Sequence, residues 1–258
     1  MAYTTIDDPS AHFQVTTWTG DGSSPRTITN GGNSNLQPDL VWHKNRSDSG
    51  RSHYIHDSTR GFGAHNELVP NSNTNENSDS HLTNNHGYIA SASTDSFVLG
   101  AGATNDNYTN KSSSTYVAWQ WKANGGTTTT NDASATSVGS VDSVYQANTT
   151  SGFSIVTYTG TGSGDITLAH GLGKVPEWVI IKDRDGGSYP HWNVWHPGYQ
   201  PDTTHLNYQL YLELTNQANN AGWTRADSGM TTNLFCIPRY QYNETGKTYD
   251  EMYGSDGK

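Results

Sequence analysis

One short segment gathers the residue types best suited to binding a ligand, and it runs from His191 to His196 as His-Trp-Asn-Val-Trp-His. Indole rings offer flat apolar faces, while amide and imidazole groups form directional hydrogen bonds. Successive side chains of a strand point to opposite faces, so Asn193 and Trp195 would share one face and leave Trp192 for the core. The sequence therefore predicts a candidate glycan-binding site made of His191, Asn193, Trp195 and His196.

Two other patterns resemble metal sites without completing one. Residues 183–187 (Asp-Arg-Asp-Gly-Gly) resemble the start of a calcium loop, but no bidentate Glu follows at the required distance. An acidic turn between two strands explains the same residues. The eleven histidines lack the spacing to Cys or carboxylate groups that a tetrahedral zinc site needs, although a site bridging subunits stays open as an alternative. We expect neither a metal nor a cofactor.

Catalytic signatures are equally sparse. A glycosidase needs two carboxylates about 5–10 Å apart across a cleft, and no spacing singles out a pair among the acidic candidates. Those candidates are Asp39, Asp57, Glu177 and Glu213. The chain contains no G-x-S-x-G elbow, P-loop or dinucleotide fingerprint, and Cys236 between two apolar neighbours is typical of a buried thiol. We therefore expect no catalytic residues and no enzymatic activity.

Composition indicates the kind of fold that must position these residues. Hydrophobic residues make up 31% of the chain and charged residues 15%, so much of the remainder is Asn, Thr, Ser and Gly. Eight Trp and fifteen Tyr among β-branched residues indicate thin aromatic cores beneath long polar loops. Cores this small gain from burial against another subunit, so we expect a homo-oligomer.

Charge and hydropathy exclude two classes of partner. A net charge of −10 argues against a surface for nucleic-acid phosphates, which needs clustered Lys and Arg. No run of about 18 apolar residues occurs, so we expect no membrane span. The first residues carry neither a basic nor an apolar segment, so we expect no export signal.

The chain contains an internal repeat. Residues 13–22 (FQVTTWTGDG) return as residues 153–162 (FSIVTYTGTG), and residues 38–46 (PDLVWHKNR) return as residues 176–184 (PEWVIIKDR). Two shorter matches follow at the spacing of the second pair: His53-Tyr54 with His191-Trp192, and Ser96-Phe97 with Leu234-Phe235. Four matches in one order indicate a duplication.

The size of the repeat predicts the domain organisation. Each copy is domain-sized, whereas a solenoid unit has roughly 20–50 residues. We therefore predict a first domain over residues 1–126, a polar linker over residues 127–150 and a second domain over residues 151–258.

Periodicity indicates strands in both copies. Phe13, Val15 and Thr17 alternate with Gln14 and Thr16, as in a half-buried strand, and the second copy repeats the alternation. The run after each repeated proline reads as a more fully buried strand. The expected fold class is all-β, with two tandem homologous β-sandwich domains of jelly-roll or lectin-like type.

These motifs resemble the repeat domains of bacteriophage virion proteins, especially those of marine phages and cyanophages. The resemblance covers most of the first copy and the front half of the second. It rests on the F-x-x-x-x-[WY]-T-G-x-G openings, on GFSIVTYTGTGS and HGLGKVP within residues 152–176, on HDSTRG at residues 56–61 and on TYVAWQWKA at residues 115–123.

The resemblance implies a structural role in the virion. It implies a tail-fibre-like or other surface-appendage protein, assembled in the host cytoplasm, with other virion proteins as partners and a trimer as the favoured oligomer. Two alternatives stay open: a carbohydrate-binding module that recognises a host surface glycan, and a capsid decoration protein. The family pattern carries no catalytic residues.

The second copy departs from this pattern at its end. The first copy closes with an aromatic strand over residues 116–121, whereas Thr248-Tyr249 is followed by Asp250-Glu251. Two adjacent acids suit a core strand poorly. Two explanations stay open: another subunit fills the position of the closing strand, or this end is a docking tail.

Overall fold

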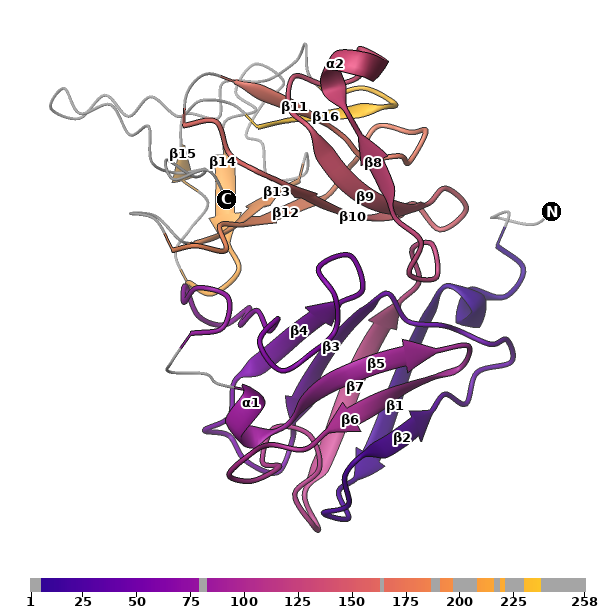
Figure 1. The fold of residues 1–258 in the computed structure, drawn as a ribbon, viewed down its shortest axis with the longest axis vertical. Helices are drawn as coiled ribbons and strands as arrows, with labels where there is room; N and C mark the ends of the chain where they lie inside the picture. Colours follow the sequence, from indigo (N-terminus) through magenta and orange to yellow (C-terminus); the bar gives the residue numbers. More distant parts are fainter. Residues whose placement is uncertain are drawn as a thin grey trace, which may run out of the picture. The chain divides into compact units, whose positions relative to one another are not determined.

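The computed structural model describes residues 6–78, 83–162, 165–186, 191–196, 208–215, 219–220 and 230–237. Strands make up most of the regular structure, and the strand pairs are antiparallel (Figure 1). The all-β fold class expected from the sequence is confirmed.

The elements occur in the following order. The strands of the first half are β1 (Phe13–Thr19), β2 (Arg26–Thr29), β3 (Leu40–Asn45), β4 (His53–Asp57), β5 (Tyr88–Ser93), β6 (Ser96–Gly100) and β7 (Thr115–Trp121). They are followed by β8 (Thr129–Asn131), β9 (Ser143–Asn148), β10 (Phe153–Tyr158), β11 (Ile166–Ala169), β12 (Val179–Lys182), β13 (Trp192–Trp195), β14 (Tyr208–Tyr211), β15 (Asn219–Asn220) and β16 (Leu234–Ile237). The short helices are η1 (Pro9–Ala11), α1 (Thr83–His86) and α2 (Ala133–Thr136).

The chain folds into two compact units that do not follow the halves of the sequence. Unit 1 comprises Met1–Val69, Glu76–Thr128 and Gln146–Phe153, and unit 2 comprises Pro70–Asn75, Thr129–Tyr145 and Ser154–Lys258. Each unit therefore includes a segment from the other half of the chain. This division differs from the expected domains over residues 1–126 and 151–258.

The expected polar linker over residues 127–150 forms regular structure, and that interpretation is wrong. β8 pairs with β9, Thr129 opposite Tyr145 and Asn131 opposite Ser143, in a three-stranded sheet of order β10-β9-β8. Asp132 caps α2 between these strands by accepting a hydrogen bond from Ala135 N. The segment is polar, but threonine favours extended backbone as other β-branched residues do, and composition alone could not separate the two states.

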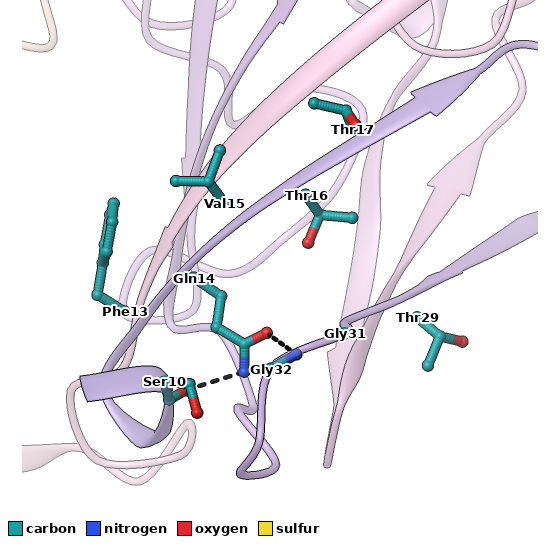
Figure 2. Close-up of a pocket in the computed structure, with 9 residues that line it drawn as sticks. All are labelled: Ser10, Phe13, Gln14, Val15, Thr16, Thr17, Thr29, Gly31 and Gly32. Atoms are coloured by element: carbon teal, nitrogen blue, oxygen red, sulfur yellow. Dashed lines mark hydrogen bonds between the residues drawn. The ribbon is translucent and has the colours of Figure 1, made fainter. Parts of the chain in front are cut away.

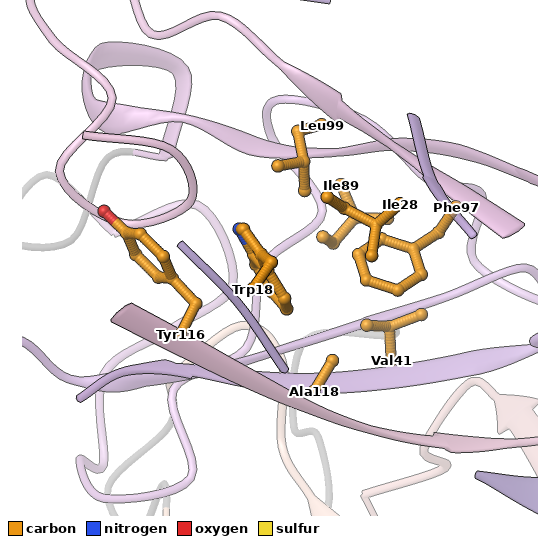
Figure 3. Packing of buried hydrophobic residues seen from close by; sticks show 8 residues of the cluster. All are labelled: Trp18, Ile28, Val41, Ile89, Phe97, Leu99, Tyr116 and Ala118. Atoms are coloured by element: carbon orange, nitrogen blue, oxygen red, sulfur yellow. The ribbon is translucent and has the colours of Figure 1, made fainter. Parts of the chain in front are cut away.

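Unit 1 is a β-sandwich. One sheet has the order β1-β7-β3-β4 and the other β2-β6-β5. Both sheets contribute buried side chains to a single core, shown in Figure 3: Trp18, Val41, Tyr116 and Ala118 from the first, and Ile28, Ile89, Phe97 and Leu99 from the second. The Trp18 ring centroid lies 5.3 Å from that of Tyr116 and 5.7 Å from that of Phe97, so this indole joins the two layers.

β1 presents Gln14 and Thr16, together with Trp18, to the interior, and its other two apolar residues lie on the opposite face. Gln14 is buried, whereas Phe13 and Val15 are 38% and 51% exposed. Inside the sandwich, Gln120 Nε2 donates to Thr16 Oγ1 and to Asn30 Oδ1, at 3.0 and 2.8 Å. A buried polar group is tolerated when it is hydrogen-bonded, and this network provides partners for the Gln120 amide nitrogen, Thr16 and Asn30.

One strand pair recurs in both units in the same register. Ile28 of β2 lies opposite Phe97 of β6, and Leu168 of β11 lies opposite Phe235 of β16. Aligning the repeated motifs places Leu168 at Ile28 and Phe235 at Phe97. The matching sequences therefore form the same cross-strand pair twice.

The neighbouring pair recurs with a shift of one residue. Lys44 of β3 lies opposite His53 of β4, and Lys182 of β12 lies opposite Trp192 of β13. The ladder therefore matches His53 with Trp192, one position later than the His53/His191 match in the sequence. One additional residue between β12 and β13 accounts for the shift. Each side chain of β13 therefore lies on the opposite face from the one that the sequence match predicts.

Unit 2 has its own apolar core. Its buried members are Ile166, Leu168, Ile181, Phe235 and Ile237, on strands β11, β12 and β16. Half-buried residues from β10, including Val156 and Tyr158, pack against it. The remaining described sheet has the order β12-β13-β14-β15.

Candidate binding surfaces

The predicted glycan-binding segment lies on β13, between β12 and β14. Asn193 is 2% exposed, and its Nδ2 donates to the carbonyl oxygen of His191 at 3.2 Å. Trp192 is buried, and its Nε1 donates to the carbonyl oxygen of Ser72 at 3.1 Å. Both faces of the strand are therefore covered at these two positions.

His191 is held by a buried carboxylate. Its Nδ1 lies 2.5 Å from Oε1 of Glu213, whose Oε2 accepts a hydrogen bond from the backbone N–H of Trp192 at 3.2 Å. The His191 ring also packs on Tyr211, with centroids 4.7 Å apart. The carboxylate and the tyrosine fix the start of β13, so one imidazole nitrogen is already engaged.

The other two predicted residues keep partial exposure. Trp195 is half-buried and packs against the core of unit 2, and His196 is half-buried after the end of β13. The structure therefore places His191, Asn193, Trp195 and His196 next to one another along the chain, but it does not bring all four onto one open surface.

The calcium-like segment is a turn. Asp183 Oδ1 accepts from Asp185 N at 2.9 Å, and the carbonyl oxygen of Asp185 accepts from Asn75 Nδ2 at 2.8 Å. In the described ranges, no three His, Cys, Asp or Glu side chains come close enough to hold a metal ion. None of the helices in the described part of the chain has the length and apolar character that crossing a membrane requires.

The acidic candidates have structural partners. Asp39 is fully buried, its Oδ2 accepts from Ala123 N and Gly125 N at 2.7 and 2.8 Å, and its Oδ1 accepts from Gly126 N and Ser58 Oγ at 2.6 and 2.8 Å. Its sequence counterpart, Glu177, is exposed. The two acids therefore share a position in the repeat but not an environment.

A second buried cluster surrounds Arg60. Its guanidinium bonds to Asp57 Oδ2 at 2.5 Å and to Glu76, and its side chain is 3% exposed. Cys236 is also buried, and desolvation raises the pKa of its thiol to about 11, which keeps it protonated and unreactive at neutral pH. These groups stabilise the fold.

An apolar surface on the outside of unit 1 was not predicted from the sequence. We call it the outer aromatic face, and its members lie on adjacent strands of the β1-β7-β3-β4 sheet: Phe13, Val15, Trp42, Trp119 and Trp121. Phe13 lies opposite Trp121, and Val15 opposite Trp119, which lies opposite Trp42. Alternation along the strands therefore collects three tryptophans on the side away from the core.

Ring contacts hold this face in shape. The centroids of Phe13 and Trp121 are 5.0 Å apart, and those of Trp42 and Trp119 are 6.3 Å apart in an edge-to-face arrangement. Trp42 Nε1 donates to His53 Nδ1 at 3.0 Å. Burial, together with the nearby Lys44 charge, lowers the pKa of His53, so its ring stays neutral and accepts this bond at neutral pH.

A hollow of about 460 Å³ runs along the edge of the sandwich beside β1 (Figure 2). Phe13 and Val15 line it from the outer aromatic face, and Gln14 lines it from the interior side. Gln14 is fixed by hydrogen bonds to the Ser10 carbonyl oxygen and from Gly32 N, both 2.9 Å. The hollow therefore combines an aromatic wall with rigid polar groups.

Unit 2 exposes apolar residues on the strand that corresponds to β3. Trp178, immediately before β12, is 64% exposed, and Ile180 is 38% exposed. They correspond in sequence to Leu40 and Trp42. A pattern in the sequence could have revealed both surfaces. In each case apolar residues recur at alternate positions of a strand, on the face opposite the one that faces the core.

One family is matched by comparison with known proteins. The sequence model of a family described as a domain of unknown function (DUF7483) matches residues 8–252, a range that spans both units. No curated protein and no solved structure matches the chain.

Proposed function

The chain belongs to the DUF7483 family, a domain of unknown function. We propose that it is a non-enzymatic structural protein of a bacteriophage virion, as a tail-fibre-like or other surface appendage. The phage assignment is supported by the resemblance of the repeated motifs. The structural role is supported by the arrangement of the sheets.

The outer aromatic face carries this proposal. Large apolar patches on a folded surface mark sites of interaction, because their burial against a partner is favourable. Phe13 and Val15 are among the most exposed large apolar residues of the described chain, and they adjoin three tryptophans. The face is therefore suited to assembly against a partner.

Purified particles provide the test. An antibody against the chain should label intact virions at a defined location, and quantitative mass spectrometry should give a fixed copy number per particle. A few copies at the tail support an appendage, whereas a copy number that follows the shell symmetry supports a capsid decoration protein. Absence from purified virions contradicts the structural proposal.

Glycan recognition is the second candidate function, and the hollow beside β1 favours it over β13. A sugar ring can pack on Phe13 while its hydroxyl groups bond to threonine and serine side chains at the rim. On a glycan array, Phe13→Ala should abolish binding and Trp195→Ala should preserve it. Loss with Trp195→Ala alone would place the site on β13, and no binding by the unmodified chain would contradict this function.

A further inference from the structure

Three histidines lie on the paired strands β3 and β4 of unit 1. His43 of β3 and His56 of β4 are fully buried, and their ring centroids are 5.6 Å apart. His53 lies on the opposite face of β4, where its Nδ1 accepts the hydrogen bond from Trp42 Nε1. β4 therefore carries histidines on both of its faces.

The contacts of β4 depend on neutral imidazole rings. Neither ring nitrogen of His56 has a hydrogen-bond partner among the described residues, so a proton there would place a charge in a fully buried site. His53 Nδ1 accepts from Trp42 only while this nitrogen carries no proton. Burial and the nearby charge of Lys44 lower the pKa of His53. Protonation on either face of β4 therefore opposes its pairing with β3.

The surroundings of His43 also favour the neutral ring. Burial lowers its pKa to about 3, and the proximity of His53 acts in the same direction. The backbone of Tyr108 favours the protonated ring, but with a smaller effect. On the other side His43 stacks on Tyr54, whose hydroxyl stays neutral because burial raises its pKa. These neighbours supply no negative charge to a protonated His43.

His56 has charged groups of both signs around it. Burial lowers its pKa well below the usual value, and the proximity of His43 and of Arg60 lowers it further. The acids of this region are Asp57 and Glu76, both bonded to Arg60, and Glu67, next to the Leu68 that bridges to Ile55. Their negative charge does not reverse the shift, so His56 too resists protonation while β4 is in place.

The packing of β4 is separate from the main core of unit 1. Tyr54 of β4 forms a buried cluster with Val69 and Tyr108. Ile55 N donates to the carbonyl oxygen of Leu68 at 2.8 Å, and Leu68 N donates to that of Ile55 at 3.0 Å. The buried residues of the main core lie instead on β1, β2, β3, β5, β6 and β7. β4 can therefore separate from β3 while the main core stays packed.

Unit 2 has apolar residues at the positions of the buried histidines. The ladder places Ile181 at the position of His43 and Trp195 at that of His56. Both side chains pack in the core of unit 2, and neither can take up a proton. The fold therefore accepts apolar residues at these positions, and the titrating pair is a property of unit 1 alone.

We infer that β4 is an acid-released strand: uptake of protons by His43, His53 and His56 separates it from β3 while the rest of unit 1 stays folded. Release withdraws His53 from the outer aromatic face, where it bonds to Trp42 and stacks on Trp119 with centroids 6.4 Å apart. This inference rests on the proposed function, which takes that face as the assembly surface, and it adds acid as the signal that regulates the face.

The direction of the effect follows from proton linkage. Histidines freed by the opening of β4 take up protons near their ordinary pKa of about 6.5, whereas the buried rings resist protonation to lower pH. Opening is therefore favoured increasingly as the pH falls through this range. For His43 alone, the change from pH 7 to pH 4 should favour opening roughly 200-fold.

Hydrogen exchange on the full chain, corrected for the intrinsic effect of pH on exchange, tests this inference. Between pH 7 and pH 4, the protection of the β4 amides should fall about a hundredfold or more. At pH 4 it should lie at least about tenfold below that of the β6 amides, which belong to the other sheet. A change of less than about threefold in β4, or equal protection of β4 and β6 at each pH, overturns the inference.

Two variants test the assignment to the buried pair. His43→Gln combined with His56→Gln removes both titrating rings and should limit the fall in β4 protection to about tenfold. His65→Gln, the matched control at an exposed histidine, should leave the fall unchanged. Where the double variant does not fold, His43→Ile alone should reduce the fall at least about tenfold. The full fall in either buried-site variant overturns the inference.

The exchange measurement uses the isolated chain, so its result is independent of where the chain is found. A chain present in virions whose β4 protection ignores pH contradicts this inference alone. A chain with an acid-released β4 that is absent from virions contradicts the proposed function alone.

Discussion

Units 1 and 2 share one strand pair in detail and differ in the strand beside it. Ile28–Phe97 and Leu168–Phe235 are the same cross-strand contact, whereas β3 is flanked on both sides and β12 on one side in the described residues. The repeated motifs therefore specify local pairings. The surroundings of the β3 side chains also depend on the strand that pairs with the other edge of β3, and in unit 1 that strand is β7.

Asp39 and Glu177 illustrate the same lesson at one position. Asp39 bonds to the backbone of residues 123–126, which directly follow β7, and it is buried as a consequence. Glu177 occupies the corresponding sequence position and is exposed. The acid is repeated in the sequence, but Asp39 has its structural role because the segment that follows β7 supplies the hydrogen-bond donors.

The largest expected effect follows from this contrast. Asp39→Ala should lower the free energy of unfolding by about 5 kcal/mol, because three backbone N–H groups lose their acceptor in a buried site. Glu177→Ala, the matched control, should change it by less than about 0.5 kcal/mol. Urea unfolding measures both, and equal losses would show that the two positions are equivalent after all.

Acid should destabilise unit 1 through two buried histidines. His43 and His56 are fully buried with rings 5.6 Å apart, and burial lowers the pKa of His43 to about 3 and that of His56 well below its usual value. The unfolded chain therefore takes up protons first, and stability should fall as pH decreases from about 6.5 to about 3, by roughly 4 kcal/mol for His43.

A substitution that copies unit 2 isolates the contribution of His43. The ladder places Ile181 of β12 at the position of His43, and isoleucine cannot titrate. His43→Ile should therefore reduce the loss of stability over this pH range, measured by denaturant unfolding at each pH. An unchanged pH profile would contradict the assignment of acid sensitivity to this residue.

The shared strand pair should respond alike in both units. Ile28 and Leu168 are buried, so Ile28→Ala and Leu168→Ala should each cost about 3 kcal/mol. Hydrogen exchange can follow each unit separately, with the amides of β6 reporting on unit 1 and those of β16 on unit 2. A cost below about 1 kcal/mol in one unit would show that the recurring register conceals different packing.

The smallest effect is expected on the exposed apolar positions. Val15→Ser and Trp178→Ser should each change the free energy of unfolding by less than about 0.5 kcal/mol, because these side chains already contact water. Thermal unfolding of the isolated protein measures this. A large loss would mean that either side chain packs more tightly than its exposure indicates.

The fold class was predictable from the sequence, but the orientation of individual strands was not. Alternation in β1 was visible, yet Gln14 and Thr16 face inward, because segments later in the sequence supply their hydrogen bonds: Ser34 and Gly32 for Gln14, Gln120 and Asn30 for Thr16. Residues 127–150 were misread because polar composition suits a linker and a polar strand alike. Both errors concern contacts between segments far apart in the chain, which local patterns do not contain.

The candidate site was predicted in part. Trp192 and Asn193 are both buried, and Trp195, expected on the accessible face with Asn193, packs against the unit 2 core. Asn193 lies opposite Ile181 of β12, a member of the unit 2 core, and opposite Tyr211 of β14. The outer aromatic face was missed because alternation alone does not show which face of β1 is buried, and Phe13 and Val15 share their face with Trp119 and Trp121 only through strand pairing.

An image reconstruction of the intact phage particle tests the central claim most directly. We expect density for both units on the particle surface, with the outer aromatic face of unit 1 against a neighbouring subunit. Particles whose density and protein content lack this chain would contradict the claim.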